Sequence, residues 1–112
     1  MNLSDALTKY ESGISEFDRL VKFKHFFNSL ELVTNMAGTD LKGDDFDNEV
    51  QRILSISKSD ATSWREFYNR IKHVQKHSDD IEKYYEGADT LTLAKRLLDI
   101  RTSLNGLLLS KL

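Results

Sequence analysis

The segment from residue 63 to residue 77, with the sequence SWREFYNRIKHVQKH, concentrates side chains that can exchange protons and bind anions. On an α-helix that turns by about 100° per residue, Glu66, Arg70, His73 and His77 fall on one narrow strip. Imidazole exchanges protons near neutral pH, and guanidinium presents a planar fork that matches phosphate oxygens. A phosphate clamped by Arg70 could therefore react beside His73 or His77, which would act as acid and base.

Cationic and polar side chains flank this strip. The segment carries four fixed positive charges against the single negative charge of Glu66, within a chain whose net charge is −2. Such a local excess of positive charge favours an anionic ligand. The residues expected to contact RNA or a partner protein are Arg65, Glu66, Asn69, Lys72 and Lys76.

The same strip also fits a salt bridge without function or a zinc site. Arg70 could pair with Glu66 four residues earlier on a solvated face, with the histidines beside them and no function. His73 and His77 also have the spacing of two helical zinc ligands. The intervening VQK lacks the glutamate of the HExxH motif, and the neighbouring lysines repel a cation. We therefore expect no metal ion and no other cofactor.

An amphipathic helix is predicted to position these side chains. Ser63 followed three residues later by Glu66 is typical of a capping box, which predicts that the helix begins at Ser63. The apolar residues recur at helical spacing and are predicted to form its core face. They are Trp64, Phe67, Tyr68, Ile71 and Val74.

The same periodicity predicts the rest of the chain to be helical. Helices are expected over residues 2–12 with a loosened turn at Gly13, over 15–36, from 46 to just before 58, and over 90–112. Asp44 or Asp45 should cap the third of these helices. A short helix is predicted around Ile81 and Tyr85. The last helix is expected to share one face among Leu91, Ala94, Leu97, Leu98, Leu104 and Leu108.

These elements predict one all-α domain over residues 1–112, an up-and-down bundle of about four main helices plus one or two short ones. The chain has no proline, which suits uninterrupted helices, and no cysteine, which excludes disulfides and thiolate metal sites. No apolar run reaches the length of a membrane span or a signal peptide, so we expect a cytoplasmic protein without a membrane partner. The slightly acidic balance argues against a dedicated duplex DNA binder.

The motif FYNRIKH, residues 67–73, and the upstream segment FFNSLEL, residues 26–32, resemble the HEPN superfamily of small all-α domains. That family has an arginine followed four to six residues later by a histidine, near the symmetric interface of a dimer. Six residues separate Arg70 from His77, and Ile71 stands where the family usually has a polar residue. A second alignment, through Asn69 and His73, places Tyr68 at the arginine position.

The resemblance implies two functions. Because the motif departs from the family pattern, we expect a non-catalytic or weakly active HEPN-like module that contacts RNA or a partner protein. The alternative is a metal-independent endoribonuclease, such as the toxin of a toxin–antitoxin pair, with Arg70 as phosphate clamp and His77 or His73 as acid and base. An antitoxin would then be the protein partner. Wide apolar surfaces on the helices 15–36 and 90–112 also favour a homodimer.

Overall fold

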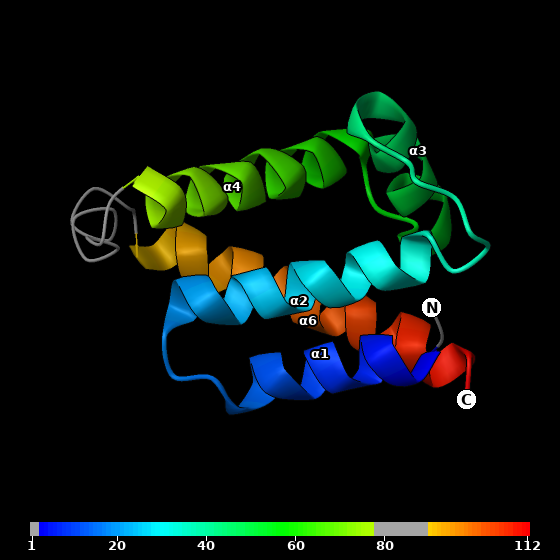
Figure 1. The fold of residues 1–112 in the computed structure, drawn as a ribbon, viewed down its shortest axis with the longest axis horizontal. Coiled ribbons are helices and arrows are strands. Elements are labelled where there is room, and N and C mark those ends of the chain that lie inside the picture. The colour runs from blue at the N-terminus through cyan, green and yellow to red at the C-terminus, as the bar shows by residue number, and fades with distance from the viewer. Residues whose placement is uncertain (1–2, 78–89) are drawn as a thin grey trace.

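The computed structural model describes residues 3–77 and 90–112, and these residues form α-helices without any strand. The expected short helix around Ile81 and Tyr85 lies outside the described residues. The all-α prediction is therefore confirmed for the described part of the chain. The helices are α1 (Leu3–Ser15), α2 (Arg19–Thr34), α3 (Gly43–Leu54), α4 (Lys58–His77) and α6 (Thr90–Ser110) (Figure 1).

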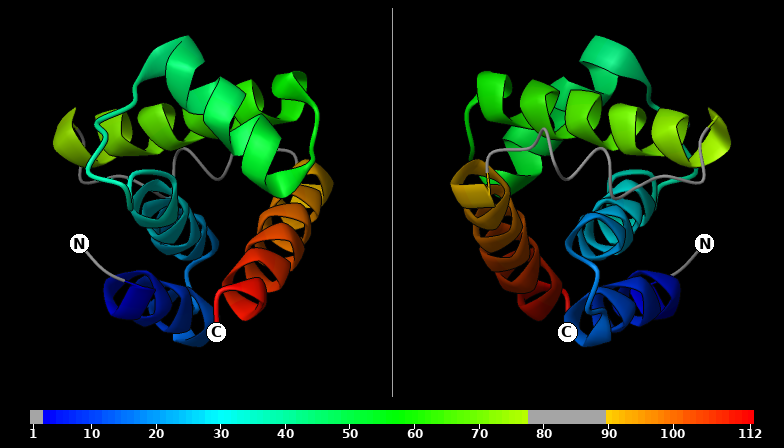
Figure 2. Two further views of the ribbon diagram at one scale, coloured as in Figure 1. Left: turned by 90° about the vertical axis from the view of Figure 1, so that its right-hand side faces the viewer. Right: turned by 90° about the vertical axis from the view of Figure 1, so that its left-hand side faces the viewer.

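Helix α2 is the centre of the bundle, because it contacts α1, α3, α4 and α6. α1 and α2 form an antiparallel hairpin along one side (Figure 1). α2 and α6 diverge from each other, and α4 crosses over both of them at an angle (Figure 2). α3 packs on the first half of α4, near the connection between the two. Within residues 3–77 and 90–112, no helix is long and apolar enough to cross a membrane.

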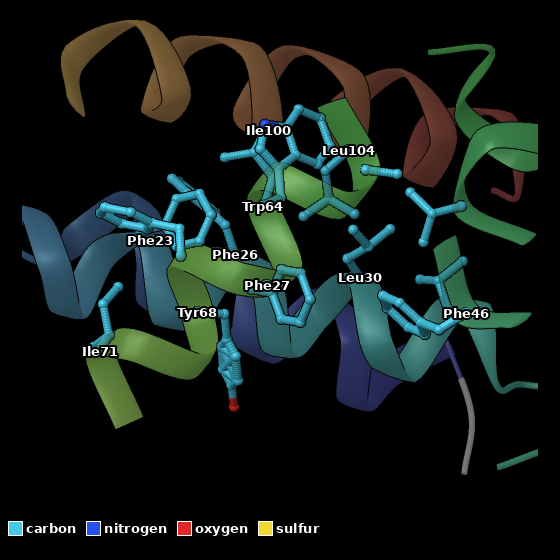
Figure 3. Close-up of a cluster of buried hydrophobic side chains, with 14 of the residues drawn as sticks. Phe23, Phe26, Phe27, Leu30, Phe46, Trp64, Tyr68, Ile71, Ile100 and Leu104 are labelled. Carbon is cyan, nitrogen blue, oxygen red and sulfur yellow. The ribbon is translucent and has the colours of Figure 1, made fainter. Parts of the chain in front are cut away.

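Aromatic side chains of α2 and α4 make up much of the core (Figure 3). Phe23 meets Phe67 edge to face with 4.9 Å between ring centroids, and Phe27 stacks on Tyr68 at 4.4 Å. Tyr68 directs its hydroxyl out of the cluster (Figure 3). The predicted core face of α4 is thereby confirmed for its described side chains, because Trp64, Phe67, Tyr68 and Ile71 are all buried.

The predicted core face of α6 is wrong in part. Leu93 and Ile100 are buried together with Leu104, whereas Leu91 and Leu98 are 78% and 64% exposed. Leucines occur on every side of this helix, so hydrophobicity alone does not say which side faces the core. The contact with α2 decides it, and it leaves a second row of leucines in solvent.

Three predicted helix starts also differ from the structure. α4 begins at Lys58, five residues earlier than expected, where the Ser57 hydroxyl accepts the backbone N–H of Asp60 at 3.0 Å. Ser63 is therefore inside the helix, and its spacing to Glu66 is not a capping box. α2 begins at Arg19 rather than residue 15, because Asp18 accepts the N–H groups of the first turn. α3 begins at Gly43, ahead of the aspartates expected to cap it, without a side-chain cap.

Helix α1 continues through Gly13 instead of loosening there. The glycine is needed for packing, since a Cβ at this position would stand 2.6 Å from two ring carbons of Phe26. The Lys22 ammonium then donates to the carbonyl oxygens of Gly13 at 2.6 Å and Ile14 at 3.1 Å. These bonds satisfy carbonyls at the end of α1 and join it to the start of α2.

Candidate functional site

Helix α4 presents the predicted site residues on two different sides. Glu66, Arg70 and His73 are exposed on one side, as the predicted strip requires. His77 lies in the last turn of α4, and its side chain, like that of Lys76, is outside the described part of the structure. The remaining three predicted contact residues, Arg65, Asn69 and Lys72, line a pocket on the other side of the helix.

On the strip side, α6 contributes a second arginine. The guanidinium carbon of Arg96 lies 4.6 Å from the centroid of the Phe67 ring, and that of Arg70 lies 5.9 Å from the same centroid. Both distances are within the range of a cation–π contact. The ring therefore holds one guanidinium from each helix near a single point of the surface. We call Arg70 and Arg96 the arginine pair, and Phe67 is the ring that both contact.

Neither member of the arginine pair has a carboxylate partner within the part of the chain that the structure describes. Among residues 3–77 and 90–112, no ion pair joins Arg70 or Arg96 to an acidic side chain. In particular, the alternative pairing of Arg70 with Glu66 does not form. Two fixed positive charges thus remain available to an anion, and two guanidinium forks can each offer paired N–H donors to phosphate oxygens.

Arg65 has a structural partner that sequence analysis missed. Its Nε and Nη2 donate to the two carboxylate oxygens of Asp47 at 2.8 and 2.9 Å, and the Thr62 hydroxyl donates to Asp47 at 2.8 Å. Asp47 is 0% exposed. The carboxylate raises the pKa of Arg65, chiefly through these hydrogen bonds. Arg65 thus joins α3 to α4, so most of its charge is already compensated and little is left for RNA or a partner.

The pocket beside Arg65 has a volume of about 280 Å³ and lies between α2, α3 and α4. The Tyr68 hydroxyl donates to Oδ1 of Asn28 at 2.6 Å on its wall, and the Lys72 ammonium lies 5.0 Å from the Tyr68 ring centroid. Burial and the nearby Glu31 carboxylate raise the pKa of Tyr68 well above its ordinary value. Tyr68 therefore remains a hydrogen-bond donor throughout the physiological pH range.

Glu31 is the acidic group of this pocket. Burial raises the pKa of its carboxyl group, and Lys72 and the Tyr68 hydroxyl oppose that rise. A half-buried carboxylate beside one lysine is unusual enough to mark the pocket for attention. The sequence could not predict that Glu31 on α2 lies near Lys72 on α4, because the pattern within one helix does not indicate which helices pack against each other.

The described residues contain no group of three histidine or acidic side chains placed to hold a metal ion. Comparisons with known proteins found no matching protein-family model, and no curated protein or solved structure is similar enough to count as a match. Over the described residues, fold and site together define an all-α bundle with two arginines that meet at one ring on one side of α4 and a polar pocket on the other.

Proposed function

We propose that this protein is a HEPN-like helical module that contacts RNA through the strip of α4 and the adjoining part of α6. The observation that carries the proposal is the arginine pair: Arg70 and Arg96 converge on Phe67 without a carboxylate partner among the described residues. A guanidinium stacked on an aromatic ring keeps its fork free for a phosphate oxygen. The resemblance of residues 67–73 to the HEPN motif supports the same location.

Binding of a fluorescently labelled single-stranded RNA, followed by anisotropy over a range of salt concentrations, tests this function. Each phosphate contact on a single strand contributes about 0.7 to the slope of log K against log salt concentration. The double variant Arg70→Ala/Arg96→Ala should bind more weakly and lose up to two such increments. The variant Arg70→Lys/Arg96→Lys keeps both charges and should recover most of the slope, with less affinity because the forks are gone.

Arg101→Ala is the matched control, because Arg101 is an exposed arginine on another side of the same helix. It removes one positive charge of the same kind, against two in the double variant, and should leave the affinity close to that of the wild type. If the double variant and the control bound RNA equally, the arginine pair would have no part in binding. Absence of binding by the wild type at low salt would remove the proposed function itself.

A second candidate function is metal-independent RNA cleavage on the same strip. The observation that favours it is the exposure of His73 beside Arg70 on one side of α4, with His77 one turn further along the helix. Arg70 would neutralise the phosphate while a histidine exchanges the proton. Incubation of labelled RNA with the protein and a chelator distinguishes the candidates: cleavage that is lost in Arg70→Ala/His77→Ala supports the enzyme, and binding without cleavage supports the module.

We further propose that the protein forms a homodimer. Support comes from the row of leucines that α6 leaves in solvent, Leu91, Leu98 and Leu109, which are 78%, 64% and 61% exposed. Positions seven and eleven residues apart fall on one side of a helix, so the three side chains form one apolar row. A second copy would remove it from water, and a two-fold axis near α6 would bring two arginine pairs into one assembly.

A further inference from the structure

The pocket on the other side of α4 has no part in the RNA-binding proposal. Acidic, basic, amide and aromatic side chains line it together. The pocket is lined by Glu31 of α2 and by Phe46 of α3. Helix α4 contributes Asn69 and Lys72. Three helices therefore contribute one acid, the base Lys72, one amide and an aromatic surface to a single concave space. Two further bases line it: Arg65, which is paired with Asp47, and Lys42, which directly precedes α3. Such a set of converging polar groups on an apolar floor is typical of a small-molecule site.

Glu31 and Lys72 interact without touching. The charge of Lys72 acts on the Glu31 carboxyl group, yet the two form no ion pair among the described residues. Lys72 instead lies over the Tyr68 ring. A negative and a positive group thus line the same pocket without forming an ion pair with each other. A ligand that carries an ammonium next to a carboxylate would match this pair, with each ligand charge facing its opposite.

The volume of the pocket and its aromatic lining residues restrict the class of ligand further. Its volume of about 280 Å³ is at or below the range of drug-sized pockets, which suits a molecule of amino-acid size rather than a cofactor. Phe27 and Phe46 line it, and their rings lie 5.7 Å apart. Phe27 and Phe46 are 3% and 4% exposed, so only a small part of each ring borders the pocket, and an apolar ligand group can contact the rings there.

We propose that the pocket between α2, α3 and α4 binds a free aromatic amino acid. Glu31 accepts hydrogen bonds from the ligand ammonium, Lys72 pairs with the ligand carboxylate, and the ligand ring packs toward Phe27 and Phe46. The Asn69 amide is placed to bond either polar group. Burial raises the pKa of Glu31, and a ligand ammonium would add to the charge compensation that Lys72 provides.

Titration with L-phenylalanine, followed by ¹H–¹⁵N correlation spectra of the full chain, tests this assignment and locates the site. The amides of Glu31, Phe46, Asn69 and Lys72 should shift, and those on the strip around Arg70 should not. Glycine lacks the ring, 3-phenylpropionate lacks the ammonium, and L-phenylalaninamide lacks the carboxylate and mimics the start of a peptide. Each of the three should bind about tenfold more weakly or worse, the cost of one lost polar or apolar contact.

Two variants separate the roles of the charged groups. Glu31→Gln should weaken L-phenylalanine but leave 3-phenylpropionate unchanged, and Lys72→Gln should weaken L-phenylalanine but leave L-phenylalaninamide unchanged. Arg101→Ala is the control, since Arg101 is exposed on α6 and does not line the pocket, and it should bind the amino acid as the wild type does. The proposal is overturned if L-phenylalanine produces no shifts at millimolar concentration, if the shifts lie elsewhere, or if the amide binds as well as the acid.

Discussion

Asp47 is the residue whose environment differs most from what its type suggests. It is a completely buried carboxylate, and three hydrogen bonds from Arg65 and Thr62 satisfy it. A buried ion pair of this kind need not stabilise a fold relative to an apolar pair, but removing one partner leaves the other charge uncompensated. The pair therefore fixes how α3 sits on α4, and with it the shape of the pocket beside Arg65.

Asp47→Ala should lower the free energy of unfolding by about 3–5 kcal/mol, the usual cost of breaking a buried ion pair from one side. Urea titration followed by circular dichroism measures the change. Asp45→Ala is the control, since Asp45 is exposed in the first turn of the same helix and should cost at most about 1 kcal/mol through the helix dipole. Equal losses in the two variants would mean that the Asp47–Arg65 pair contributes nothing specific.

Glu31 gives a prediction with a pH dependence. Burial raises the pKa of its carboxyl group in the folded protein, so the folded state holds this proton more tightly than the unfolded state. The contribution of Glu31 to stability is therefore most favourable at low pH and is lost as the pH rises through the raised pKa. Glu31→Gln should be more stable than the wild type at pH 7.

The advantage of Glu31→Gln should shrink as the pH falls through the pKa of Glu31 in the folded state, because the wild-type side chain then also becomes neutral. Thermal unfolding at a series of pH values follows the difference. Glu66→Gln, an exposed change on the other side of α4, controls for the loss of one negative charge. A wild type that is more stable than Glu31→Gln at neutral pH would contradict the assignment of Glu31 as a half-buried carboxylate whose burial outweighs the effect of Lys72.

At the scale of the element, two glycines inside helices behave in opposite ways. Gly13 lies against the ring of Phe26, whereas a Cβ placed on Gly106 has no described atom within 4 Å apart from its chain neighbours and the backbone of its own helix. Glycine is unfavourable inside any helix because it loses the most backbone entropy on folding. At Gly13 the close approach of α1 to α2 offsets this entropic cost. At Gly106 no packing contact in the described part of the chain offsets it.

Gly13→Ala should therefore destabilise the protein by about 1–3 kcal/mol, the range for inserting a methyl group into a packed core. Gly106→Ala should stabilise it by about 0.5–1 kcal/mol, because it improves helix propensity without a clash. The two substitutions are chemically identical, so each is the control for the other in the same unfolding measurement. A stabilised Gly13→Ala would show that α1 can move away from Phe26 at little cost.

For the whole molecule, the exposed leucines of α6 lead to a prediction about assembly. The double variant Leu91→Lys/Leu98→Lys should convert a dimer to a monomer, because charged side chains would have to be desolvated at the contact. Sedimentation equilibrium at several concentrations measures the mass. Phe17→Lys is the matched control: Phe17 is 98% exposed, but it lies in the connection before α2.

Dissociation by Phe17→Lys, with the α6 variant still dimeric, would place the contact at the start of α2 instead. A wild type with the mass of a monomer over a tenfold range of concentration would remove the homodimer and leave the leucine row unexplained. It would not affect the RNA-binding proposal, because the arginine pair lies within one chain.

The sequence by itself determined the helical fold and the direction of the α4 side chains. Period 3.6 is a local property, so the spacing of Trp64, Phe67 and Ile71 was enough to place Arg70 and His73 in solvent. Helix starts were less well predicted, because several serines and aspartates could cap: Asp18 caps α2, Ser57 caps α4, and no side chain caps α3. The Ser63 capping box failed for this reason, since Ser57 begins the helix.

Tertiary structure alone decided which distant side chains meet. The ring of Phe67 brings Arg96 to Arg70, buried Asp47 takes up Arg65, and the crossing of α4 over α2 sets Lys72 beside Glu31. Tertiary packing also determined which side of α6 is buried, because leucines on all sides of this helix left its core face undetermined in the sequence. Each outcome depends on how helices pack against one another, and the period of a single helix carries no information about its neighbours.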